Sequence, residues 1–77
     1  LPAVRYVARA LDMEGTQKVR ESVESVGTRH RSAYRLCNFV HDAVAIVVSQ
    51  DGTVRVVKWH DGEVTYWDYV STSVLDL

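Results

Sequence analysis

The sequence predicts an α/β or α+β fold, in which helices pack on a small and mainly antiparallel sheet. Apolar residues recur at helical spacing in the first half of the chain. After Asp42 they gather in short strand-like segments, separated by the two Asp-Gly pairs at 51–52 and 61–62. With 77 residues the chain forms one domain at most, and such a chain buries only about 60% of the surface that its unfolded form exposes.

Two helices are expected before Gly27. Residues 3–12 carry apolar side chains along one stripe, and residues 17–26 place three valines at i, i+4 and i+7. Thr16 is a suitable N-cap for the second of these helices, and Gly27 is a suitable C-terminal stop. Residues 1–26 are therefore predicted to form a helical lead-in to the rest of the domain.

A third helix is expected over residues 29–39, with Thr28 as its N-cap. Its apolar stripe consists of Ala33, Leu36, Cys37 and Val40. Extended backwards, this stripe reaches Arg29 and His30, which are expected to lean toward the buried side, with Arg31 nearly opposite.

The first turn of this third helix carries an unusual charge. Arg29, His30 and Arg31 are consecutive there, although the N-terminus of a helix has a partial positive charge that disfavours cations. An anion bound at this end would remove the conflict, because helix N-termini are ready phosphate sites. The cluster therefore predicts a phosphate-binding site, and a solvated basic turn is the alternative.

Three strands are expected after this helix. Residues 43–48 form an unbroken apolar run, which is typical of a strand buried on both faces. Residues 53–59 and 63–70 complete a meander, and an Asp-Gly pair forms each turn. The meander gives the first strand only one neighbour, so its other edge is expected to be bare and apolar, which natural proteins avoid. We expect a missing N-terminal half, or else another chain, to cover this edge.

The overall charge argues for a local rather than a global anion site. The net charge is −1, with 9 basic and 10 acidic residues, which gives no reason to expect a nucleic acid or an anionic membrane as partner. The single cysteine excludes an internal disulfide, and no apolar run is long enough to span a bilayer. We expect a cytoplasmic protein, and the first residue, Leu1, suggests a fragment or a processed chain.

Two segments resemble motifs of the diadenylate cyclase (DAC) family. The first is residues 27–33 (GTRHRSA), which open a helix as the Gly-Thr-Arg-His-Arg motif of that family does. The second is residues 42–51 (DAVAIVVSQD), an Asp-Ala pair that leads into an apolar strand ending in Val-Ser. The resemblance implies a partial diadenylate-cyclase-like fold, with residues 27–70 forming the nucleotide-site helix and the meander of a single partial domain.

The resemblance also implies an activity. Enzymes of this family join two ATP molecules, held by facing subunits, into cyclic di-AMP with the help of a Mg²⁺ or Mn²⁺ ion. By this resemblance Thr28, Arg29, His30 and Arg31 would bind the nucleotide phosphates, and Ser49 would contact the nucleotide. The partners implied are ATP or cyclic di-AMP and a second copy of the chain.

Two departures from the family pattern leave other functions open. The Asp-Gly-Ala motif of the family is absent before Gly27, and Gln50 stands where the family usually has Glu after Val-Ser. Glutamine lacks the charge that favours a divalent metal. A nucleotide sensor without catalytic activity is therefore one alternative, and a β-rich interaction module without nucleotide is another.

Other candidate groups have simpler explanations. The pairs His41-Asp42 and His60-Asp61 lack metal-ligand spacing, and Ser49 lacks the Gly-x-Ser-x-Gly setting of a hydrolase nucleophile. Cys37 is expected to be a buried, inert thiol. The aromatic residues of the meander are expected to pack on a sheet face, with stacking on adenine as the alternative; they are Trp59, Tyr66, Trp67 and Tyr69.

Overall fold

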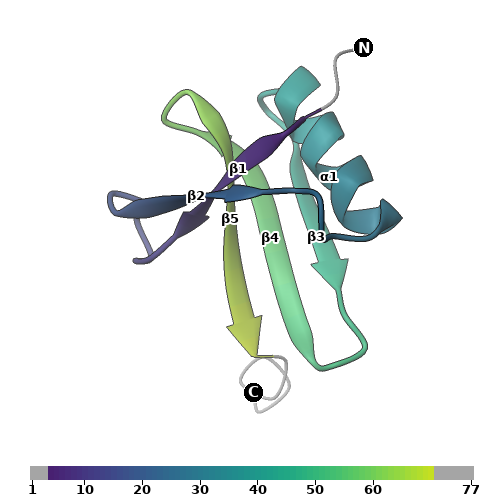
Figure 1. Ribbon diagram of the computed structural model, residues 1–77. Coiled ribbons are helices and arrows are strands. Elements are labelled where there is room, and N and C mark those ends of the chain that lie inside the picture. The colour runs from purple at the N-terminus through teal and green to yellow at the C-terminus, as the bar shows by residue number, and fades with distance from the viewer. Residues whose placement is uncertain (1–3, 71–77) are drawn as a thin grey trace.

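One helix packs on a five-stranded sheet in the computed structural model, which describes residues 4–70 (Figure 1). The elements in chain order are β1 (Tyr6–Ala10), β2 (Lys18–Ser22), α1 (Thr28–Phe39), β3 (Val44–Val48), β4 (Thr53–His60) and β5 (Glu63–Val70). The strand order in the sheet is β2-β1-β5-β4-β3. All neighbours are antiparallel except β1 and β5, which are parallel. The predicted α+β class with a mainly antiparallel sheet is therefore confirmed.

The two helices predicted before Gly27 are wrong, and so is the helical lead-in. Residues 3–12 and 17–26 instead supply β1 and β2, which form an antiparallel hairpin. The helical spacing of the apolar residues led to the wrong prediction, because valines spaced by three or four residues also fit short strands with a loop between them. Pairing of β1 with β5 in the middle of the sheet outweighs the weak local helix preference. Of the three valines expected on the buried face of the second helix, Val19 is exposed. Only Val23, which lies beyond β2, is buried.

The loop between β1 and β2 depends on Gly15. The hairpin closes where the Leu11 amide donates to the Gln17 carbonyl at 2.8 Å. Gly15 has a φ of +72°, and a Cβ there would meet the His60 and Trp67 side chains at 2.9 Å. The loop is thus folded back onto the sheet at a point where only glycine fits.

Replacing Gly15 with alanine is expected to lower the free energy of unfolding by about 1–3 kcal/mol, because strain at positive φ adds to a steric clash. Gly62→Ala is the matched control, since Gly62 also has a positive φ of +83° but has nothing within 4 Å of the added Cβ. Urea unfolding of both variants measures the difference. Equal losses would show that the contact with His60 and Trp67 does not matter.

The helix α1 confirms the prediction for residues 29–39, with a shifted start. Gly27, and not Thr28, is the N-cap, in an extended conformation and with no side chain capping the first turn. The first intrahelical bond runs from the Arg31 amide to the Gly27 carbonyl at 3.1 Å. Thr28 is therefore the first helical residue, and the N-cap prediction is wrong by one position.

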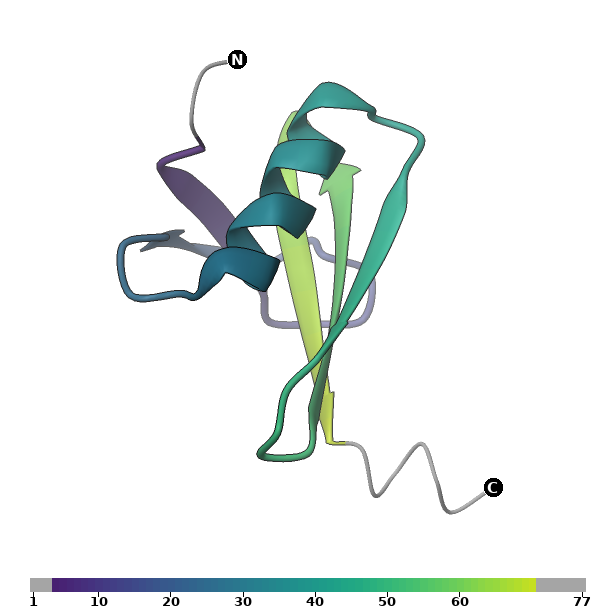
Figure 2. The same ribbon diagram turned by 90° about the vertical axis from the view of Figure 1, so that its right-hand side faces the viewer.

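The buried face of α1 is turned slightly from the predicted stripe. Ala33 and Cys37 are buried as expected, whereas Leu36 and Val40 are exposed. Tyr34, which the stripe left out, is only 1% exposed and lies among the core residues. In Figure 2 the helix lies in front of β4 and β5, between the β1–β2 hairpin and β3. Its inner face packs mainly on β3 and β4 and less on β5.

Cys37 is a buried thiol, as predicted. It is fully buried, and its Sγ donates to the Val57 carbonyl at 3.4 Å. Burial raises the pKa of the thiol above its usual range, which keeps it protonated and unreactive.

Strand β3 lies at the edge of the sheet with β4 as its one neighbour, so the predicted bare edge is confirmed for the described residues. The Ser49 amide donates to the Thr53 carbonyl at 2.8 Å. In an antiparallel pair every second residue points its backbone N–H and C=O groups away from the neighbouring strand. These groups of Val44, Ile46 and Val48 therefore point toward the free edge. These side chains are 58%, 65% and 56% exposed. The prediction that this strand is buried on both faces is therefore wrong, because α1 covers only one face.

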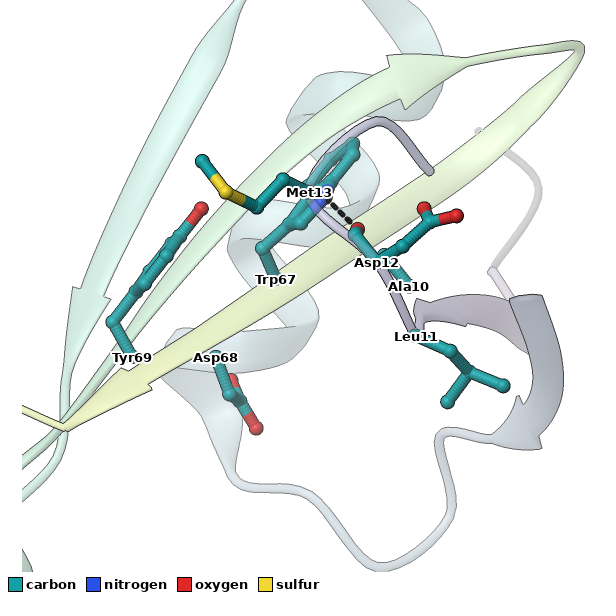
Figure 3. Close-up of a pocket in the computed structure, with 7 residues that line it drawn as sticks. All are labelled: Ala10, Leu11, Asp12, Met13, Trp67, Asp68 and Tyr69. Atoms are coloured by element: carbon teal, nitrogen blue, oxygen red, sulfur yellow. Dashed lines mark hydrogen bonds between the residues drawn. The ribbon is translucent and has the colours of Figure 1, made fainter. Parts of the chain in front are cut away.

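Three of the four aromatic residues of the meander pack on the sheet, but on both of its faces, and Tyr69 is 41% exposed. Tyr66 is buried beneath α1, and Trp59 stacks on His41 with 3.7 Å between ring centroids. Figure 3 shows Trp67 and Tyr69 on one side of β5 and Asp68 on the other. The indole nitrogen of Trp67 donates to the Asp12 carbonyl at 3.1 Å, which fastens the β1–β2 loop to the outer face.

Candidate functional site

A groove of about 480 Å³ separates the first half of α1 from strand β3. The helix contributes one wall and consecutive residues of β3 the other; the lining residues are Thr28, Arg29, Ser32, Ala33, Ile46, Val47 and Val48. The start of the helix lies beside the end of β3 because the two elements run in opposite directions (Figure 1). The groove therefore joins the two segments that the sequence singled out.

The basic cluster of the first turn spreads in three directions. Arg29 is exposed and lines the groove. His30 is half-buried and meets the ring of Tyr34 edge-on, with 6.4 Å between centroids. Arg31 points away and donates from Nη2 to the Glu24 carbonyl at 2.9 Å. The expected inward lean is thus found for His30 and not for Arg29.

The positive end of α1 is open at this groove. The first turn contains no acidic residue, and Gly27 has no side chain that could cap it. The first amide groups of a helix have no partner within the helix. Together with the guanidinium of Arg29 they present hydrogen-bond donors and positive charge, which is the chemistry that binds phosphate.

His30 favours its neutral form. Burial lowers its pKa, and the positive charge of Arg55 lowers it further, against the opposing effect of Asp68. A neutral imidazole carries one donor and one acceptor nitrogen. In the free protein near neutral pH, His30 therefore adds hydrogen-bonding capacity to the first turn without adding a full charge.

Ser49 lies directly after Val48, at the end of β3 that borders the groove, but it is not one of the lining residues. Its amide closes the β3–β4 turn. The next two residues of the turn are exposed, and the Asp51 carboxylate accepts from the Thr53 amide at 3.1 Å. Ser49 and Gln50 are thus near the groove, while Asp51 is engaged in the turn.

The described residues do not form a site for the metal that the resemblance implied. Residues 4–70 contain no group of three or more His, Cys, Asp or Glu side chains close enough to hold an ion. The groove is lined by hydroxyl, guanidinium and apolar side chains and offers no carboxylate. Magnesium is usually held by one or two carboxylates together with substrate phosphates, so this groove alone does not fit it.

A network of polar side chains beneath α1 was missed in the sequence. Arg55 of β4 donates to both carboxylate oxygens of Asp68 on β5, at 2.7 and 2.9 Å. Its third nitrogen donates to the hydroxyl of Tyr34 at 2.7 Å, and its guanidinium lies 3.8 Å above the ring of Tyr66. The sequence could have placed Arg55 on the side of β4 that faces the helix. Side chains alternate along a strand, so Arg55 lies on the same face as the apolar Val57, two residues further on.

The network extends to the β1–β2 hairpin. The Tyr66 hydroxyl donates to the Glu21 carboxylate of β2, which also lies 3.9 Å from a guanidinium nitrogen of Arg9. Burial and the Glu21 carboxylate raise the pKa of Tyr66 well above its usual range. Burial alone would lower the pKa of Arg55, but its bonds to Asp68 and Tyr34 raise it. Both groups therefore keep their protons at all ordinary pH values.

A comparison with known protein families matches the part of the chain that forms the groove. The sequence model of the DAC family, described as "DisA bacterial checkpoint controller nucleotide-binding", matches residues 3–63. The chain belongs to the DAC family. The DAC match includes the whole of α1, β3 and β4, so both walls of the groove lie within it. No curated protein and no solved structure matches the chain significantly.

The DAC match also extends over β1 and β2, which the motif resemblance did not reach. The hairpin is thus part of the region that the family model matches. Within residues 4–70, no helix has the length and apolar character that crossing a membrane requires.

Proposed function

We propose that this DAC domain binds ATP through its phosphates in the groove between α1 and β3. The observation that carries the proposal is the position of Arg29 and the uncapped first turn of α1 on this groove, in a chain of a nucleotide-binding family. A nucleotide triphosphate supplies the negative charge that this end of the helix lacks.

Each member of the motif has a role in this proposal. Arg29 binds a phosphate with the forked geometry of its guanidinium, and Thr28 adds its hydroxyl. Arg31, which points away from the groove in the free chain, turns toward the same ligand by exchanging its bond to the neutral Glu24 carbonyl for an ion pair with a phosphate. His30 supports the first turn from its sheet side and donates from one ring nitrogen. Ser49, at the end of β3, contacts the nucleotide beyond the phosphates.

The reaction that the family suggests is the joining of two ATP molecules into cyclic di-AMP. The 3′-hydroxyl of each ATP attacks the α-phosphate of the other and loses its proton to solvent. Two new P–O bonds form, the two bonds from the α-phosphorus atoms to pyrophosphate break, and two pyrophosphates leave. This needs two nucleotides face to face, so a second copy of the domain is required. It also needs a Mg²⁺ or Mn²⁺ site, which the groove does not supply from its own residues.

A nucleotide sensor that does not catalyse is the second candidate. Gln50, an exposed residue next to the groove, stands where the resemblance expects a glutamate. A sensor of this kind would bind ATP or cyclic di-AMP and release it unchanged. Mass spectrometry for cyclic di-AMP, after incubation with ATP and Mn²⁺, separates the two candidates.

The bare edge of β3 is proposed to take a further β-strand, from a second copy of the chain or from an N-terminal half of the domain. Its apolar side chains and free backbone groups favour such an addition. A cytoplasmic location is part of the same proposal, because ATP is abundant there.

Titration of the chain with ATP in a calorimeter tests the proposed function. Arg29→Ala is expected to weaken ATP binding about ten- to a hundredfold, because a charge-assisted hydrogen bond contributes about 1.5–3 kcal/mol. Arg35→Ala is the matched control: Arg35 is an exposed arginine on the same helix and does not line the groove. It removes the same charge and should leave the affinity within about twofold.

Two results would contradict the proposal. One is no heat of binding from the unchanged chain at millimolar ATP. The other is an equal loss of affinity in the Arg29 and Arg35 variants, which would indicate a diffuse charge effect and not a site.

A further inference from the structure

Arg55 connects both walls of the nucleotide groove, although it does not line it. Its backbone pairs with that of Val47, which is the middle one of the three β3 residues that line the groove. Its guanidinium donates to the Tyr34 hydroxyl at 2.7 Å, and Tyr34 is adjacent to the groove residue Ala33. One residue therefore ties the helix wall to the strand wall.

The guanidinium of Arg55 is held on three sides. Asp68 accepts two of its hydrogen bonds, the Tyr66 ring lies 3.8 Å beneath it, and Tyr34 accepts the third bond. Its side chain is 17% exposed. A two-pronged arginine–carboxylate pair fixes both distance and angle, and a partner held in this way cannot shift without breaking several contacts. Tyr34 is accordingly fixed over the sheet, and the helix with it.

We propose that Arg55, through Tyr34, is a positioning residue that sets the distance between α1 and β3 and thereby the affinity of the groove for nucleotide. The inference rests on the proposed function, because it concerns how the same groove binds ATP. The groups of the first turn act together on one ligand only when the helix is correctly placed, and small displacements of binding groups are costly. The contact of His30 with Tyr34 extends this control to the first turn itself.

Tyr34→Phe is the most selective test, because it removes the hydroxyl and keeps the buried ring. It is expected to weaken ATP binding about fivefold, which corresponds to about 1 kcal/mol for one hydrogen bond. Arg55→Met is expected to weaken binding at least as much. In the double variant the two losses should not add, because both changes break the same link.

Cys37→Ala is the matched control for a general loss of stability. Cys37 lies one turn after Tyr34 on the same helix and is fully buried, and its Sγ donates to the carbonyls of Ala43 and Val57 and not to a side chain of the network. This variant is expected to melt at a lower temperature and to bind ATP with unchanged affinity at a temperature where it is folded. Circular dichroism confirms folding of all variants before calorimetry.

The outcomes separate the two proposals. If the unchanged chain binds ATP and the Tyr34 and Arg55 variants bind it equally well, the positioning role is wrong and the proposed function stands. Additive losses, or the same loss in Cys37→Ala, would also overturn it. If the unchanged chain does not bind ATP, the proposed function is wrong and the positioning role falls with it.

Discussion

Replacing Tyr34 with alanine is expected to lower the free energy of unfolding by about 3–5 kcal/mol, the usual loss for a buried aromatic residue. The side chain is 1% exposed and stacks on Tyr66 with 6.3 Å between ring centroids. The change also leaves a nitrogen of Arg55 without its acceptor. Domains of this size are stable by only about 5–15 kcal/mol, and often by less than the middle of that range. A fall of about 15–30 °C in melting temperature should follow.

The matched control for this substitution is Phe39→Ala. Phe39 is an aromatic residue of the same helix, but its side chain is 68% exposed. Its removal should change stability by no more than about 0.5 kcal/mol. Thermal melting followed by circular dichroism measures both variants, and a similar loss in both would show that α1 does not pack on the sheet through Tyr34.

The second half of the fold could be predicted from the sequence because its signals are local. The Asp-Gly turns and the β-branched runs between them predict β3, β4 and β5, and no predicted bound differs from the structure by more than one residue. The first half could not be predicted in this way. The strands β1 and β2 exist because β1 pairs with β5, whose partner residues lie 57 positions further along the chain, and no local pattern records that pairing.

The residues of the candidate site were chosen from the sequence and stay a prediction, whereas their arrangement could not be predicted from it. The charge conflict at Arg29, His30 and Arg31 is visible in the sequence, and the groove places that turn beside the end of β3 as the motifs suggested. The directions in which Arg29, His30 and Arg31 point depend on which face of α1 packs on the sheet. Tyr34 lies on that face. The link from Tyr34 to Arg55 joins a helix and a strand, so that only the folded chain reveals it.

The two edges of the sheet differ in a way that predicts how the chain associates. β2 carries Lys18 and Arg20, whereas β3 has no charged residue and exposes Val44, Ile46 and Val48. Charged residues protect edge strands, and bare apolar edges invite pairing with another strand. A second copy that pairs antiparallel around Ile46 would place the two Ile46 side chains together, since a two-fold axis matches like with like.

Ile46→Lys is therefore expected to weaken self-association of the chain at least about a hundredfold, because it removes two apolar side chains from the contact and each contributes about 1.5–3 kcal/mol when buried. Ile46 is 65% exposed, so the fold itself should keep its stability. Val19→Lys is the matched control, since it adds the same charge at a half-exposed valine of the opposite edge strand. Sedimentation over a range of protein concentrations compares the three proteins. Pairing of two copies through this edge is wrong if the unchanged chain stays monomeric throughout, or if both lysine variants associate as it does.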